Sequence, residues 1–161
     1  MNVWPTDCET WAIALPTLCC TAARVSVSRL SIEQVEVAVA IDAACFDHPW
    51  SQDAYDAALL DALDFDGCVA VARDSTGHPL GVCVAVVDDR VLRIARLAVV
   101  QSQRRKGVAS ELVWYVLEHA SALGIGRARV VTHRSNDVAR QLYARLGFLL
   151  ERDQPTNVNS R

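Results

Sequence analysis

The chain has 161 residues and a formal net charge of −3, from 16 Lys and Arg side chains against 19 Asp and Glu. Hydrophobic residues make up 52% of the chain and charged residues 22%, a balance that excludes a wholly disordered protein. The slight acidity also argues against nucleic-acid binding through an overall basic field. We therefore expect one globular domain of ordinary size without a nucleic-acid partner.

The longest uncharged run covers residues 10–23, and it is shorter than the roughly 20 apolar residues that span a bilayer. Asp7 and Glu9 are the charges that precede this run, whereas an export signal carries Lys or Arg there. We predict a cytoplasmic protein without a membrane segment. Its six cysteines include no C-x-x-C pair, so we interpret them as reduced thiols and expect no metal.

The first half of the chain begins without a clear pattern. Residues 1–23 show no hydrophobic period, and we predict an irregular N-terminal extension there. Residues 24–30 alternate polar and apolar side chains, as a half-buried strand does. Ser31 and Gln34 have the spacing of a capping box, which predicts a helix over residues 32–45.

A second helix and three strands are expected next. Pro49 disfavours helical geometry in the residue before it, and Ser51 is placed to cap a helix that runs to about residue 63. Short apolar segments then alternate with hairpin-length turns, which predicts three antiparallel strands. These strands are expected at residues 68–73, 80–87 and 91–99.

The remainder of the chain alternates helices and strands. The expected elements are a helix over residues 107–123, a strand over 128–132, a helix over 137–146 and a strand that begins at 148. The order βααβββαβαβ predicts a mixed α/β domain with a central sheet. We place this domain at residues 24–153 and interpret residues 154–161 as a polar tail.

A basic turn precedes the helix expected from residue 107. Free amides at a helix start, together with the positive end of the helix dipole, favour phosphate. Gly107 and Ala109 keep side chains out of the way of such a ligand. Arg104, Arg105 and Lys106 add positive charge, which suits a diphosphate better than a single carboxylate.

A second motif follows about 30 residues later. Residues 136–148 have the form N-x-x-A-x-x-L-Y-x-x-x-G-F. Together with Leu97-Ala98-Val99 and the R-x-x-G-x-A turn, this pattern resembles the GNAT superfamily of acyl-CoA-dependent N-acetyltransferases. Pro49-Trp50-Ser51 further resembles the P-W-S segment of its RimI-type members, which acetylate the N-termini of ribosomal proteins. A proline turn with a packed tryptophan would explain the same three residues.

The resemblance implies a GNAT fold and acetyl-CoA as the cofactor. In that family the strand that matches Leu97, Ala98 and Val99 splays from its neighbour and pairs with the pantetheine arm. The basic turn, with Arg104, would hold the diphosphate through backbone amides, and Asn136 matches an asparagine near the cofactor arm. The amides are those of Arg105, Lys106, Gly107, Val108, Ala109 and Ser110.

The resemblance also implies catalytic roles. Tyr143 matches a tyrosine beside the thioester sulfur, and its phenol can protonate the leaving thiolate as a general acid. RimI-type enzymes place a glutamate base at the position of Val131, and valine cannot accept a proton. His133 lies on the same strand face as Val131, and we predict it as the base, acting directly or through a water.

The acceptor side is less well marked. The segment that contains Asp47, His48, Trp50 and Asp53 forms the acceptor wall in relatives, and we take Asp47 and Trp50 as substrate-binding residues. Relatives close this side with a further strand, for which the residues after Phe148 are too few. That strand is missing, is supplied by the N-terminal extension, or comes from a partner chain in a homodimer.

We therefore expect acetyl transfer from acetyl-CoA to a primary amine by direct attack, with a protein N-terminal α-amine as the acceptor. One alternative is a small amine, such as an antibiotic or a polyamine. Another is an acyl-CoA-binding regulatory module without catalysis, which the valine at position 131 favours.

Overall fold

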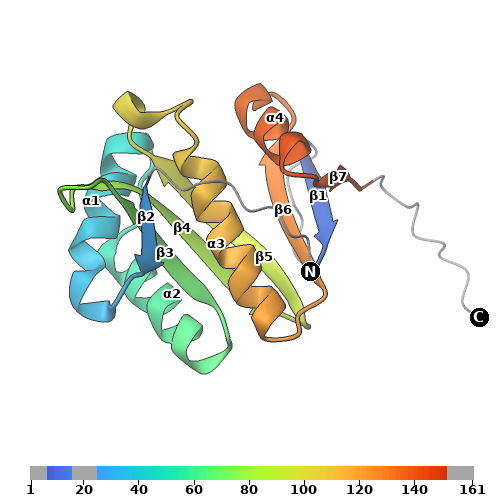
Figure 1. The fold of residues 1–161 in the computed structure, drawn as a ribbon, viewed down its shortest axis with the longest axis horizontal. Coiled ribbons are helices and arrows are strands. Elements are labelled where there is room, and N and C mark those ends of the chain that lie inside the picture. The colour runs from blue at the N-terminus through green and yellow to red at the C-terminus, as the bar shows by residue number, and fades with distance from the viewer. Residues whose placement is uncertain (1–6, 16–24, 152–161) are drawn as a thin grey trace, which may run out of the picture.

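The computed structural model describes residues 7–15 and 25–151 (Figure 1). The elements are β1 (Cys8–Ala14), β2 (Ser26–Arg29), η1 (Ile32–Gln34), α1 (Val35–Cys45), α2 (Gln52–Asp64), β3 (Cys68–Arg73), β4 (Pro79–Asp88), β5 (Val91–Val99), η2 (Gln101–Gln103), α3 (Val108–Ala122), β6 (Arg127–His133), α4 (Asp137–Arg145) and β7 (Leu149–Leu150). The predicted order βααβββαβαβ is confirmed from β2 to β7, and one further strand, β1, precedes it.

Two serines were expected to cap helices, and they behave differently. Ser51 caps α2, since its Oγ accepts a hydrogen bond from the Ala54 amide at 3.2 Å. The prediction for Ser31 is wrong, because its side chain makes no capping hydrogen bond and the first helix begins as the short 3-10 turn η1. In a capping box the backbone amide of Gln34 would donate to the Ser31 hydroxyl. Here it donates to the Ser31 carbonyl at 3.0 Å.

The described strands form one sheet of seven strands in the order β2-β3-β4-β5-β6-β1-β7. Neighbouring strands are antiparallel, except that β5 and β6 are parallel. Helices α3 and α4 cover one face, and α1 and α2 cover the other face over β3 to β5 (Figure 1). The predicted fold, a mixed and mostly antiparallel sheet flanked by helices, is confirmed.

Strand β1 corrects the prediction of an irregular extension. Residues 8–14 pair antiparallel with β6 over their whole length, and Trp11 also pairs with Leu150 of β7. The strand escaped the sequence analysis because Trp11, Ala12 and Ile13 are buried in succession, so it lacks the alternation of a half-buried strand. Among the alternatives for the closing strand, the structure therefore shows the N-terminal segment.

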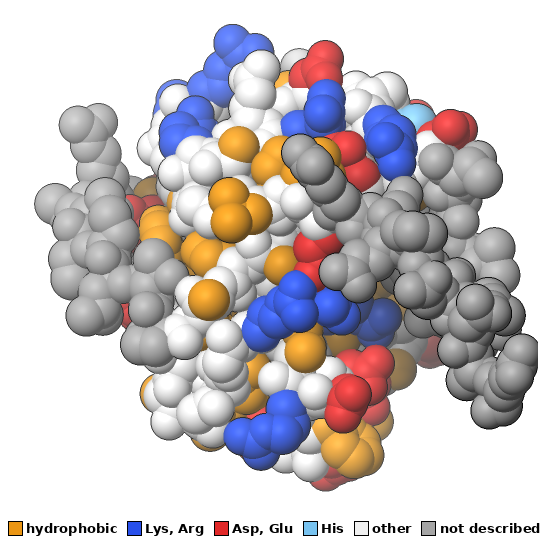
Figure 2. All heavy atoms as spheres, turned by 90° about the vertical axis from the view of Figure 1, so that its right-hand side faces the viewer, with side chains coloured by type: hydrophobic (Ala, Val, Ile, Leu, Met, Phe, Trp, Pro, Cys, Tyr) orange, Lys and Arg blue, Asp and Glu red, His pale blue; other side chains and the backbone are white. Residues whose placement is uncertain are grey.

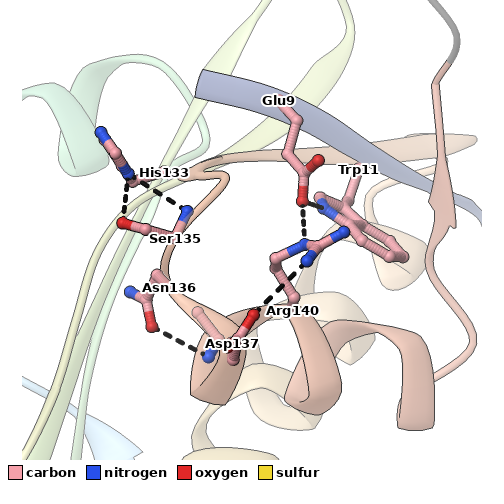
Figure 3. Close-up of polar contacts among 8 residues, drawn as sticks. Glu9, Trp11, His133, Ser135, Asn136, Asp137 and Arg140 are labelled. Carbon is pink, nitrogen blue, oxygen red and sulfur yellow. Dashed lines mark hydrogen bonds and ion pairs between the residues drawn. The ribbon is translucent and has the colours of Figure 1, made fainter. Parts of the chain in front are cut away.

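A buried carboxylate fastens β1 to α4. Glu9 is 7% exposed and accepts hydrogen bonds from Arg140 Nε at 2.5 Å and from Trp11 Nε1 at 3.1 Å (Figure 3). Arg140 also contacts Asp137 in the first turn of α4. A charge-assisted hydrogen bond in a buried site is stronger than one between neutral groups, so this contact holds the strand in its register.

The predictions on membrane segments, metal binding, cysteines and domain boundaries can be compared only with the described residues. Within residues 7–15 and 25–151, no helix is long and apolar enough to cross a membrane, and no cluster of side chains could hold a metal ion. Four cysteines there are free thiols, while Cys19 and Cys20 lie outside the described residues. Residues 1–6, 16–24 and 152–161 also lie outside them, so the predicted domain boundaries stay predictions.

Candidate active site

Strands β5 and β6 separate in the middle of the sheet. Their paired residues run from Leu92 opposite Ala128 to Ile94 opposite Val130. Further along, the segment Leu97-Ala98-Val99 pairs only with β4 among the described strands. Within residues 7–15 and 25–151, the edge that faces β6 is therefore left without a partner strand, as expected for these three residues.

A β-bulge accompanies this separation. Val84 of β4 pairs with Arg96, whereas the next residue of β4, Ala85, pairs with Ile94. Ala95 is thus the extra residue on β5. Because a bulge bends its strand and increases the local twist, it accounts for β5 turning away from β6 at this point.

The basic turn leads from η2 into α3. Residues 104–107 are exposed, and both Arg105 and Gly107 have left-handed backbone conformations, with φ of 62° and 86°. A Cβ atom added at Gly107 would meet nothing within 4 Å, so the space beside it is open. Val108, Ala109 and Ser110 follow in the first turn of α3, where backbone amides have no acceptor within the helix.

Arg104 supports this turn from within. Its Nε donates to the Val99 carbonyl at 3.0 Å, which ties the turn to the end of β5. Arg105 and Lys106 therefore supply the free positive charge beside the amides. The diverging edge and the basic turn together fit a ligand that combines an extended polar arm with a diphosphate, which is the shape of coenzyme A.

Tyr143 projects from α4 into the core beneath the sheet. It is 4% exposed, and its ring meets Phe148 edge to face at a centroid distance of 5.3 Å. Burial, and to a lesser extent the neighbouring Cys83 thiol, raises the pKa of Tyr143 above its ordinary value. The phenol therefore keeps its proton throughout the physiological pH range, as a general acid must before it donates.

Asn136 begins α4. Its Oδ1 accepts a hydrogen bond from the Ala139 amide at 3.1 Å and so caps the helix (Figure 3). The sequence predicted Asn136 only at the cofactor arm, and its capping role was missed, although asparagine is among the preferred capping residues. With Oδ1 engaged, the Nδ2 amide is the group that remains for a ligand.

His133 ends β6 and is exposed. Its Nδ1 lies 2.6 Å from the Ser135 hydroxyl and accepts a hydrogen bond from the Ser135 amide at 3.2 Å (Figure 3). Because an amide can only donate, the neutral ring carries its proton on Nε2. The lone pair that a general base needs is therefore already occupied by Ser135.

A buried ion pair, which the sequence analysis missed, organises the segment before α2. Asp42 is fully buried, and each of its carboxylate oxygens accepts two hydrogen bonds. Oδ1 receives Tyr55 Oη and Arg96 Nε, both at 2.8 Å, and Oδ2 receives the Trp50 amide at 2.6 Å and Arg96 Nη2 at 2.9 Å. Burial alone raises the pKa of Asp42, but these hydrogen bonds outweigh it and hold that pKa below its ordinary value.

Arg96 extends this network to aromatic rings. Its guanidinium carbon lies 3.7 Å from the centre of the Phe46 ring and 5.3 Å from that of Trp50. The network therefore fixes Trp50 against β5, next to the unpaired edge, while Asp47, His48 and Asp53 stay exposed. A signal was present, since an aspartate among the apolar residues of a buried helix face requires partners.

Comparisons with known proteins give a consistent assignment. The model of the acetyltransferase (GNAT) family matches residues 35–148. Among curated proteins, GCN5-related N-acetyltransferase 6, chloroplastic, from Arabidopsis thaliana is 38% identical over 55 residues. That match covers 34% of this chain and only 19% of the plant protein.

Solved structures share the fold. The ribosomal-protein-S18-alanine N-acetyltransferase from Escherichia coli superposes with a TM-score of 0.70 at 18% identity, over 78% of this chain and 77% of that one. AAC(6')-Iy, solved with the bisubstrate analogue CoA-S-monomethyl-acetylneamine, has a TM-score of 0.68 at 19% identity, over 86% of this chain and 99% of that one. At such identities, these likenesses support the fold alone.

Proposed function

Because the chain belongs to the GNAT family, whose members are acetyl-CoA-dependent acyltransferases, we propose that it acetylates the N-terminal α-amine of a protein. The observation that carries the proposal is the separation of β5 from β6 beside a basic helix start, with Tyr143 on the adjoining helix. The proline-tryptophan segment, anchored by Asp42, supports a RimI-like acceptor wall.

Acetyl-CoA supplies the acetyl group on a thioester. The chain binds the diphosphate with amides of residues 105–110 and with Arg105 and Lys106, and it offers the Leu97–Val99 edge to the arm. Tyr143 holds a proton on its Oη for the departing thiolate. Asp47 and Trp50 contact the acceptor.

The attacking amine must be neutral, so an ammonium group has to lose a proton before it reacts. His133 would act as the base only by exchanging its Ser135 contacts for the amine or for a bridging water. The neutral fraction of an amine rises with pH, so acetylation without a protein base follows the titration of the amine itself. If the dependence of rate on pH is the same in His133→Ala as in the wild type, His133 has no such role.

The engaged imidazole and Val131 favour a second candidate, which is acyl-CoA binding without turnover. A thiol-release assay with acetyl-CoA, peptides that begin with Ala or Ser, and small amines separates the two candidates. Turnover confined to the peptides supports the proposal. Calorimetric binding of CoA without turnover of any amine supports the second candidate.

Tyr143→Phe tests the catalytic assignment within the same assay. The variant is expected to bind CoA as the wild type does and to lose most of its turnover, because about 10²–10⁴-fold is typical of general acid catalysis. Tyr115→Phe on α3 is the matched control and should retain turnover. Equal rates in both variants would contradict the role of Tyr143.

A further inference from the structure

A groove of about 410 Å³ opens on the sheet face that carries α1 and α2. It lies over the part of that face, at β5, β6 and β1, that these two helices do not cover. Its walls come from the β4–β5 turn and from β5, β6 and β1, and it reaches Val131. Thr10 of the N-terminal strand lines it directly beside Val131, its register partner on β6. The groove therefore runs along β5 and β6 toward the point where these strands separate.

Two arginines lie side by side on this groove. Arg93 of β5 and Arg129 of β6 are register partners on the parallel strands, and both line the groove. Neighbouring strands are only about 4.8 Å apart, so two positive charges are held close together. Arg129 contacts Glu151 at 3.4 Å, and Glu151 is also paired with Arg127.

Arg93 is left without such a contact. Among the described residues it makes no ion pair, and its Nε is buried without a hydrogen-bond partner. A buried donor without an acceptor costs free energy. An anionic group in the groove would satisfy this donor, and a planar guanidinium is well suited to a carboxylate.

Acidic side chains limit where such an anion binds. Asp88 and Asp89 line the groove from the β4–β5 turn, at the end away from Val131. Figure 2 shows basic and acidic side chains close to one another on the edge of the molecule that carries β1 and β7. Glu151 also lines the groove and already contacts Arg129, so a further carboxylate is favoured at Arg93 and disfavoured at the turn.

The spacing to the reacting amine follows from strand geometry. Val131 lies two residues beyond Arg129 on β6 and on the same face, so the two positions are about 7 Å apart. RimI-type enzymes place their glutamate base at the position of Val131, so the proposed function puts the acceptor amine beside this residue. We infer that the groove binds a carboxylate of the acceptor. The acceptor is then a primary amine whose carboxylate lies roughly 7 Å from its amine nitrogen, the length of two strand residues.

This inference rests on the proposed function, and the acid could belong to a peptide side chain or to a small amino acid. The test compares acid and amide pairs: Ala-Glu-Ala-Ala amide against Ala-Gln-Ala-Ala amide, and 6-aminohexanoate against 6-aminohexanamide. We expect the wild type to favour one of the acids by about tenfold in kcat/KM, mainly through KM, as one charge-assisted hydrogen bond provides. The pair that shows the preference identifies the source of the acid.

Arg93→Gln is expected to bring that ratio close to one, whereas Arg93→Lys, which keeps the charge, should retain part of it. Arg145→Gln, on the exposed end of α4, is the matched control and should preserve the wild-type ratio. Thermal unfolding of each variant verifies that the fold is intact. Equal kcat/KM for acid and amide in the wild type, or an unchanged ratio in Arg93→Gln, would overturn the inference.

A second readout does not depend on turnover. Calorimetric titration of the same ligands into the protein without acetyl-CoA should show that the acids bind more tightly than the amides, and that Arg93→Gln removes the difference. If the acids bind through Arg93 but no amine is acetylated, the proposed function fails and the carboxylate site stands. If amines are acetylated but acid and amide react equally in both pairs, the function stands and the site fails.

Discussion

Replacing Asp42 with asparagine removes the counter-ion of Arg96 without changing the size of the side chain. The asparagine has one acceptor oxygen for four hydrogen-bond donors, and its NH₂ group faces donors that it cannot satisfy. Loss of one partner from a buried ion pair costs about 3–5 kcal/mol of the free energy of unfolding. Arg96 is 18% exposed and can recover some hydration, so we expect the lower end of that range.

A loss of about 3 kcal/mol corresponds to a decrease in Tm of about 6–12 °C for a domain of this size. The pH dependence gives a sharper signature. The pKa of Asp42 is lowered in the folded state, so its stabilisation is complete above the unfolded value of about 3.9 and is lost as pH falls through the folded value. The difference in stability between wild type and Asp42→Asn should therefore narrow below about pH 4.

Urea unfolding of both proteins between pH 3 and pH 7 measures this difference. Asp64→Asn, at the exposed C-terminal end of α2, is the matched control and should unfold like the wild type. A loss below about 1 kcal/mol, or a difference that stays constant down to pH 3, would refute the reasoning. If Asp42 also positions Trp50, the KM for the acceptor rises in this variant while the KM for acetyl-CoA stays unchanged.

Changes at three further positions test other parts of the structure. Gly107→Ala adds a Cβ beside the proposed diphosphate site and should weaken CoA binding in calorimetry about tenfold, whereas Gly77→Ala, with nearly the same φ in the β3–β4 turn, should not. Asn136→Ala should lower the free energy of unfolding by about 1 kcal/mol. Asn136→Asp keeps the cap and should raise the KM for acetyl-CoA if Nδ2 contacts the cofactor. Glu9→Gln should cost about 1.5–3 kcal/mol in urea unfolding, and an unchanged midpoint would show that its contact with Arg140 does not hold β1.

The sequence predicted those features that depend on neighbours in the chain. The strand and helix periods after residue 24 placed every later strand and α-helix, though not the 3-10 turns η1 and η2, because burial of one face imposes a pattern within ten or fifteen residues. The turn before α3 was equally local, since Gly107 and its basic neighbours are consecutive. The cap by Asn136 is equally local, because its acceptor oxygen and the Ala139 amide are three residues apart.

The network around Asp42 could not be predicted in the same way. Asp42 and Arg96 are 54 residues apart and come from a helix and a strand. Each was visible as a charged side chain at a position where the pattern expects an apolar one, yet nothing local pairs them. The same holds for Arg93 and Arg129, which become neighbours only because β5 and β6 are parallel.

Strand β1 shows how this limit reaches the site itself. Its partners lie at the other end of the chain, and Glu9 and Arg140 are separated by 131 residues. Closing such a long loop is entropically costly, so β1 is expected to dock after the strands β2 to β5, which join through short turns. Thr10 then completes the groove beside Val131. In this chain, therefore, the groove that we propose for the acceptor is complete only when the N-terminal strand is in place between β6 and β7.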